Sequence, residues 1–148
     1  MIPLAPQHIP TFVLAGKAMF TLRSLATSSE IALRVSYAPK KKLYYVAAFI
    51  GGKVKKGNSV FLGTFFPNTG EYRHSFKSKV PKESDAAIAA EWFFRSFLFN
   101  AEAMTTQVEL LHHNLCGRCG RPLKGKHQNG LGAHCAEELT GSLKIILP

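Results

Sequence analysis

The sequence predicts an α+β fold, in which an antiparallel meander of about five strands packs on one long helix and a small cysteine-containing module follows. Three features predict this fold. Apolar residues alternate with polar ones, or form short runs, between residues 16 and 77. Residues 86–100 then form an apolar segment without glycine or proline, and two cysteines separated by two residues come after it. A sheet, a helix and a metal-binding loop are therefore expected in that order.

The first residues are expected to stand apart from the sheet. Pro3, Pro6 and Pro10 indicate an extended leader over residues 1–11. The sheet and helix should then occupy residues 12–104, the cysteine-containing module residues 105–141, and a short tail residues 142–148.

Five strands are expected at hairpin spacing. The first covers residues 18–25, and strict alternation over residues 31–37 predicts a second strand with one buried face. Residues 43–50 form a nearly continuous apolar run, which is typical of a central strand buried on both faces. Residues 60–66 and 71–77 then form a hairpin. These strands should pair in chain order as a meander.

One long helix is expected after the strands. Ser84 is the candidate N-cap, with Asp85 in the first turn and the helix running to residue 100. Apolar side chains cover most of its circumference: Ile88, Trp92, Phe93, Phe94, Phe97 and Phe99. At helical spacing beside a sheet, such residues more often form core than a base-stacking surface. We therefore expect Trp92 to lie deep in the core.

The cysteines have the spacing of a zinc site. Two residues separate Cys116 from Cys119, and Cys135 follows later in the chain. Two thiolates at this spacing can bind one tetrahedral ion if the chain turns tightly between them. Gly117 and Gly120 allow that turn and leave amide N–H groups free to hydrogen-bond the sulfur atoms. These three cysteines are expected to hold one zinc ion.

A tetrahedral structural zinc site needs a fourth ligand. Five side chains lie within reach along the sequence: His112, His113, His127, His134 and Glu137. We favour His112, because it ends the strand that enters the module and Asn114 can adopt the left-handed turn that would bring it back. His113 is the second choice and His134 the third, since His134 adjoins Cys135.

The C-terminal motif resembles the signature of a family of small phage and prophage proteins, catalogued as a domain of unknown function. The resemblance rests on Cys-Gly-Arg-Cys-Gly-Arg-Pro-Leu at residues 116–123 and Gly-Leu-Gly-Ala-His-Cys at residues 130–135. Weaker matches extend it over roughly residues 12–139: the segment 15–21, Leu62–Gly63, Trp92 and His112. Ala133 departs from the family, which usually has proline there. The resemblance implies a zinc finger and a phage or prophage origin, and carries no settled activity.

No segment looks like a membrane anchor. The longest apolar run, residues 43–50, is far shorter than a bilayer span, and no signal peptide is evident. Three cysteines do not suggest a disulfide framework, so a reducing compartment is expected. Together with the resemblance, this predicts the cytoplasm of a host cell.

Charge indicates an anionic partner. Lys and Arg total 19 against 9 acidic residues, a formal net charge of +10. We expect Lys53, Lys55 and Lys56, in a glycine-flanked loop, to act with Arg118 and Arg121 on a phosphate backbone. Lysines 40–42 should matter less. The alternative is that the lysines only keep strand ends soluble and unpaired.

Two functions compete at this stage. The first is a non-enzymatic accessory factor that binds nucleic acid with weak sequence specificity, since no base-reading helix is evident. The alternative is a protein-binding inhibitor of a host nucleoprotein complex, either a defence system (anti-CRISPR or anti-restriction type) or a transcription complex. An enzyme is not expected. Residues 112–116 superficially resemble the motif of HNH nucleases, but Asp85 is the only aspartate available for a catalytic metal.

Overall fold

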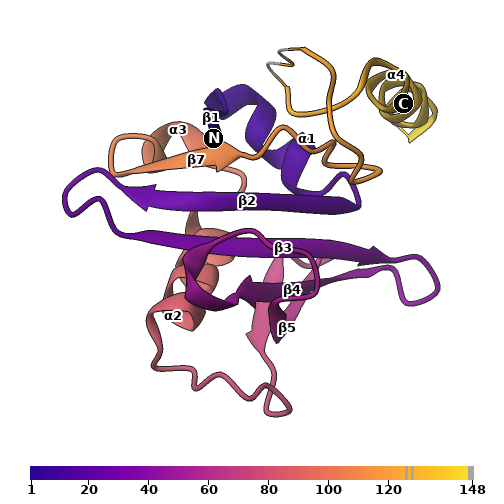
Figure 1. Ribbon diagram of the computed structural model, residues 1–148. Helices are drawn as coiled ribbons and strands as arrows, with labels where there is room; N and C mark the ends of the chain where they lie inside the picture. The colour runs from indigo at the N-terminus through magenta and orange to yellow at the C-terminus, as the bar shows by residue number, and fades with distance from the viewer. Residues whose placement is uncertain (126, 128, 147–148) are drawn as a thin grey trace.

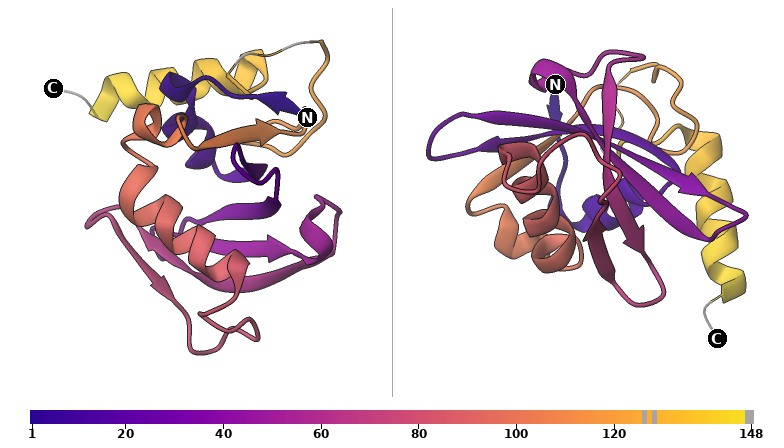
Figure 2. Two further views of the ribbon diagram at one scale, coloured as in Figure 1. Left: turned by 90° about the vertical axis from the view of Figure 1, so that its left-hand side faces the viewer. Right: turned by 90° about the horizontal axis from the view of Figure 1, so that it is seen from below.

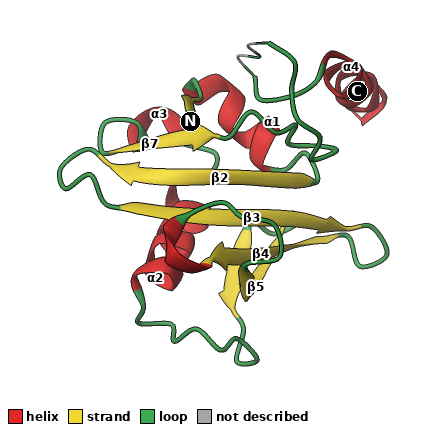
Figure 3. Ribbon diagram, in the orientation of Figure 1, coloured by secondary structure: helices red, strands yellow, loops and turns green. Residues whose placement is uncertain are grey.

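The computed structural model describes residues 1–125, 127 and 129–146, apart from the side chains of Phe97 and residues 140–146. Its main feature is one sheet of seven antiparallel strands with helices packed against it (Figures 1 and 3). The strands are β1 (Ile2–Pro3), β2 (Lys17–Ser24), β3 (Glu30–Ala38), β4 (Leu43–Phe49), β5 (Ser59–Phe66), β6 (Glu71–His74) and β7 (Val108–His112). Their spatial order is β1-β7-β2-β3-β4-β5-β6.

Strands β2 to β6 form the expected meander, but the expectation of about five strands was too low. Strand β7 inserts between β1 and β2, with Phe20 opposite His112 and Ile2 opposite that same histidine. Strand β4 is an inner strand as predicted, yet one of its faces is covered only in part, at Phe49. Val46 is fully buried, whereas Tyr45 on the other face is 36% exposed. The apolar run was therefore not evidence of two buried faces.

The helical elements are η1 (Pro6–His8), α1 (Ile9–Val13), η2 (Ile50–Gly52), α2 (Asp85–Trp92), η3 (Phe93–Phe97), α3 (Ala101–Met104) and α4 (Ala133–Ile146). None of the described helices is long and apolar enough to cross a membrane. The expected extended leader was wrong, because residues 1–11 form β1, η1 and the start of α1. Pro6 and Pro10 occupy first-turn positions, where a missing N–H costs nothing. Helix α4 also crosses the expected start of the tail at residue 142.

The prediction of one long helix was wrong. Helix α2 begins as expected, with the Ser84 hydroxyl accepting the Ala87 N–H at 3.3 Å. The chain then widens into the π-helical η3, where the Leu98 N–H donates to the Phe93 carbonyl, five residues back. Asn100 leaves helical geometry (φ −137°, ψ 50°), and α3 begins after it.

This helical segment lies against one face of the sheet, which we call the inner face (Figure 2). Aromatic rings join the two. Phe93 lies 5.7 Å from Phe20 between ring centroids, and Phe94 stacks on Tyr72 at 5.3 Å. The core interpretation therefore holds for these two phenylalanines. It does not hold for the whole helix surface, because Phe99 is 69% exposed.

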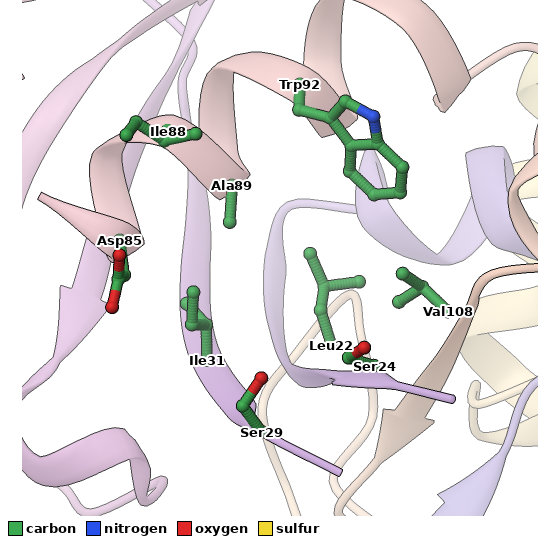
Figure 4. Close-up of a pocket in the computed structure, with 9 residues that line it drawn as sticks. All are labelled: Leu22, Ser24, Ser29, Ile31, Asp85, Ile88, Ala89, Trp92 and Val108. Carbon is green, nitrogen blue, oxygen red and sulfur yellow. The ribbon is translucent and has the colours of Figure 1, made fainter. Parts of the chain in front are cut away.

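Trp92 is only half-buried, contrary to the expectation from sequence. Its indole borders an open groove of about 300 Å³ between α2 and the ends of β2 and β3, opposite Leu22 and Ile31 (Figure 4). At the wider π-helical turn η3, Phe93 and Phe94 form the buried side of the helical segment instead. Trp92 thus forms the wall of a groove and not the centre of the core.

We expect Phe93→Ala to lower the free energy of unfolding by about 3–5 kcal/mol, because the fully buried ring leaves a large cavity. Trp92→Ala should cost less, about 1–3 kcal/mol, since part of its ring already contacts solvent. Urea denaturation measures both, with Phe99→Ala as the exposed control. A larger loss for Trp92→Ala than for Phe93→Ala would contradict this packing.

Candidate metal centre

The chain enters the cysteine-containing segment at the end of β7. Asn114 adopts the left-handed conformation predicted from sequence (φ 59°). Its side-chain amide donates to the Leu123 carbonyl at 3.2 Å, and its own carbonyl accepts the Leu123 N–H at 2.8 Å. These bonds close a loop over residues 114–123.

Inside this loop the backbone forms a knuckle. The Cys116 N–H donates to the Arg121 carbonyl at 2.8 Å, and the Gly120 N–H donates to the Cys116 carbonyl at 2.8 Å. Gly120 has a positive φ of 77°, as the predicted turn requires. The side chains of Cys116 and Cys119 consequently project to the same side.

Three sulfur atoms meet at this knuckle. The Sγ atoms of Cys116, Cys119 and Cys135 all lie within 4.8 Å of one another, with Cys135 supplied by the first turn of α4. Tetrahedral ligands at a Zn–S distance of about 2.3 Å are about 3.8 Å apart, so a small contraction would complete the geometry. The three thiols could therefore hold one metal ion.

Backbone amides favour a thiolate at this site. Burial of Cys116 raises the pKa of its thiol, but N–H groups of Gly132, Cys119 and Arg118 outweigh burial and lower that pKa to about 7. The Gly132 N–H lies 3.4 Å from the sulfur. Burial raises the pKa of the Cys135 thiol, although the Arg118 guanidinium opposes the shift. A cation would favour deprotonation of both.

The predicted fourth ligand does not join the cysteines. His112 is fully buried on the inner face, and its ring centroid lies 6.0 Å from that of Phe12. Its Nδ1 accepts the Asn114 N–H at 3.1 Å, and among the described residues the metal-ligand group contains the three cysteines alone. The β7 register, with His112 opposite Phe20, directs the imidazole into the core.

The other candidates have contacts of their own. His113 lies against the Thr21 hydroxyl at 2.8 Å, and His127 hydrogen-bonds the Lys124 carbonyl at 2.8 Å. His134 borders the cavity of about 400 Å³ at the cysteines, but its Nε2 pairs with Glu138 at 2.8 Å. Glu137 does not belong to the ligand group either.

A phenylalanine ring fixes the knuckle on the sheet. A Cβ atom at Gly117 or at Gly130 would lie 2.6 Å from Cδ2 of Phe12, so both glycines leave room for the ring. The Gly117 N–H also donates to the Gly130 carbonyl at 3.0 Å. Gly117 is therefore needed for packing against Phe12, a contact that the turn predicted from sequence did not include. Sequence reasoning missed Phe12, whose only signal was an aromatic residue directly after the expected extended leader.

The basic residues predicted to act together lie at opposite ends of the sheet. The Lys17 N–H donates to the Gly117 carbonyl at 2.7 Å, so the knuckle lies where β2 begins and β3 ends. Arg118 pairs with Glu138 there, and Arg121 is exposed. The turn carrying lysines 40–42 follows β3 at this same end.

The loop carrying Lys53, Lys55 and Lys56 lies at the other end of β4. Seven residues of strand separate the two ends, a length of about 20 Å. The structure therefore does not place this loop beside Arg118 and Arg121. Lys17 was missed from sequence, although its position directly after Gly16 indicated a strand start.

The chain matches no protein-family model, no curated protein and no solved structure. The cysteine cluster and the charges around it are therefore the basis for assigning a function.

We expect the purified protein to contain one zinc ion per chain, measured by elemental analysis. Chelation should disorder the knuckle and α4 while the sheet persists, because this segment buries little apolar surface of its own. Loss of helical circular dichroism with retained strand signal would report that change. Cys116→Ser and Cys135→Ser should each abolish stoichiometric binding, and metal-free protein from zinc-replete cells would contradict the assignment.

We expect Gly117→Ala to destabilise the metal-bound protein by about 1–3 kcal/mol, because its methyl group would overlap the Phe12 ring. Thermal unfolding with bound zinc measures this effect. Gly132→Ala is the matched control, since its Cβ would meet only Leu123 Cδ2 at 3.8 Å and its N–H to Cys116 is kept. Equal stability of the two variants would show that the ring does not hold the knuckle.

Proposed function

We propose that this chain is a small zinc-binding protein, of the phage or prophage type that its C-terminal motif resembles, and that it binds nucleic acid as a non-enzymatic accessory factor. Zinc is the proposed metal because three thiol ligands on a Cys-x2-Cys knuckle favour it over harder cations. Its proposed role is structural, since it would join two segments that are distant in sequence. The cytoplasm of a host cell remains the proposed location.

The single observation that carries nucleic-acid binding is the arrangement of unpaired positive charge. Four arginines pair with carboxylates: Arg23, Arg73, Arg95 and Arg118. Over the part of the chain that the structure describes, no lysine forms an ion pair, and neither does Arg34 or Arg121. Positive groups without carboxylate partners remain available to phosphates.

Part of this available charge lies at the knuckle end of the sheet. Lys17 begins β2 beside the knuckle, Arg121 lies on the knuckle, and the turn with lysines 40–42 projects from the same end. This grouping supports a different basic surface from the one that the sequence suggested. The proposed contact surface is Lys17, lysines 40–42 and Arg121, with Lys53, Lys55 and Lys56 as a secondary site.

We expect affinity for a DNA or RNA oligonucleotide to fall steeply with salt. Replacing lysines 40–42 by glutamine should weaken binding and reduce the slope of log affinity against log salt by about 2–3. The matched variant replaces Lys53, Lys55 and Lys56 by glutamine and should have the smaller effect, because that loop lies at the far end of β4. Fluorescence anisotropy at several salt concentrations measures both.

Wild-type protein that binds no oligonucleotide at low salt would refute nucleic-acid binding. Capture of a host defence or transcription complex after nuclease treatment would then favour the inhibitor function. An equal loss in the two lysine variants would retain nucleic-acid binding but contradict the surface assigned here.

We propose Glu138 as the fourth zinc ligand. Cys135 and Glu138 are three residues apart on α4, so their side chains share one face of the helix. His134 also borders the cavity at the cysteines, but its Nε2 pairs with Glu138 at 2.8 Å. Arg118 pairs with Glu138 and hydrogen-bonds Cys135, which places a positive group between the two acids. Zinc bound there would replace this guanidinium.

Glu138→Gln should lower zinc affinity about 10-fold or more, measured by competition with a chromophoric chelator. His112→Phe should leave affinity unchanged, because the ring lies in the core and its Nδ1 accepts the Asn114 N–H instead of facing the cysteines. Cobalt substitution gives a second readout, since the visible absorption bands should shift in Glu138→Gln alone. Loss of affinity in His112→Phe, or in His134→Gln with Glu138→Gln unaffected, would reassign the ligand.

A further inference from the structure

The face of the sheet opposite α2, which we call the outer face, carries two cross-strand rows. One row runs from Lys17 through Ser36 and Tyr45 to Thr64. The neighbouring row runs from Met19 through Arg34 and Ala47 to Phe61. Helix α2 packs against the inner face of β3 and β4 (Figure 2). These two rows are therefore not covered by that helix.

Two aromatic rings form a platform on the outer face. Tyr45 and Phe61 come from adjacent strands, with ring centroids 5.9 Å apart in an edge-to-face arrangement. Tyr45 is 36% exposed, and Phe61 is half-buried. Ser36 lies beside Tyr45 and Ala47 lies beside Phe61 in the rows. Because these side chains are small, they do not cover the two rings.

Positive charge lies on the same rows. Arg34 and Lys17 are exposed, and neither forms an ion pair with a described carboxylate. Toward the two edges of the face the charges are neutralised instead, because Arg23 pairs with Glu30 and Arg73 with Glu71. The available positive charge is thus next to the aromatic platform.

The outer face continues into the knuckle. A Cβ atom at Gly120 would lie 3.8 Å from the Lys17 side chain, so Lys17 joins the first row to the metal-binding loop. An extended polyanion could therefore contact Arg34, Lys17 and the exposed Arg121 without leaving the surface.

We propose that the outer face binds a single-stranded nucleic acid, with bases stacked on Tyr45 and Phe61 and phosphates at Arg34 and Lys17. This inference rests on the proposed nucleic-acid-binding function and specifies the form of its ligand. Aromatic platforms beside cationic side chains hold unpaired bases, whose flat faces are free to stack. In a duplex those faces are already stacked, and a broad sheet face does not enter a groove.

Fluorescence anisotropy with a fluorescein-labelled 15-nucleotide oligothymidylate, alone or paired with oligoadenylate, tests the inference. The wild-type protein should bind the single strand more tightly than the duplex. Tyr45→Ser should weaken single-strand binding about 10-fold, and Tyr45→Trp should retain it because stacking survives. Arg34→Ala should weaken binding and flatten its salt dependence.

Matched controls lie away from the outer face. Phe99→Ser removes an exposed aromatic ring after η3, and Arg95→Ala removes an exposed arginine of η3. Both variants should bind as the wild type does. Thermal unfolding of each variant confirms that it is folded, and Tyr45→Trp keeps the test decisive if Tyr45→Ser unfolds.

The outcomes separate this inference from the function on which it rests. Wild-type protein that binds neither single strand nor duplex refutes nucleic-acid binding altogether. Binding that is unchanged in folded Tyr45→Ser and Arg34→Ala, yet lost when lysines 40–42 are replaced, refutes the outer face alone. Tighter binding to the duplex than to the single strand also overturns it.

Discussion

The packing of Phe12 between two glycine-containing segments is the contact on which the cysteine cluster depends. The ring is fully buried and meets Phe20 edge-to-face at 6.3 Å, so it is anchored in the sheet core. Gly117 and Gly130 close over it from parts of the chain that also carry Cys116 and the approach to Cys135. One side chain of α1 therefore sets the position of the metal-binding loop relative to the sheet. A basic surface formed jointly by the metal-binding loop and the sheet therefore depends on how Phe12 positions that loop.

Local rules predicted the elements that local interactions determine. Alternation, short apolar runs and hairpin spacing predicted strands β2 to β6, and Ser84 before an apolar run was correctly predicted as an N-cap. The insertion of β7 beside β2 was not predictable in this way, because the pairing of Phe20 with His112 joins residues far apart in sequence. The π-helical turn was also missed, since it follows from how Phe93 and Phe94 fit the sheet and not from helix propensity. The three prolines were misread because a first-turn proline and an extended proline look alike in sequence.

The cysteine cluster was predictable from spacing alone, because two residues between thiols leave the backbone few ways to separate them. The left-handed turn at Asn114 was also expected and is present. Which way His112 points was not predictable. A one-residue change in strand register exchanges the faces of a sheet, so the imidazole could be assigned only after the register with β2 was seen. The grouping of the basic residues was not predictable for a related reason, since it depends on which strand ends lie beside the knuckle.

The insertion of β7 between β1 and β2 has a consequence for biosynthesis. During translation the meander of β2 to β6 can pair as it emerges, but the flank of β2 that β7 will cover stays open until residue 112 has been made. Strand β1, only two residues long, has no partner before then. Closure of the sheet is therefore a late step that pairs residues far apart in sequence. Chaperones that bind exposed strand edges would meet this chain chiefly in that interval.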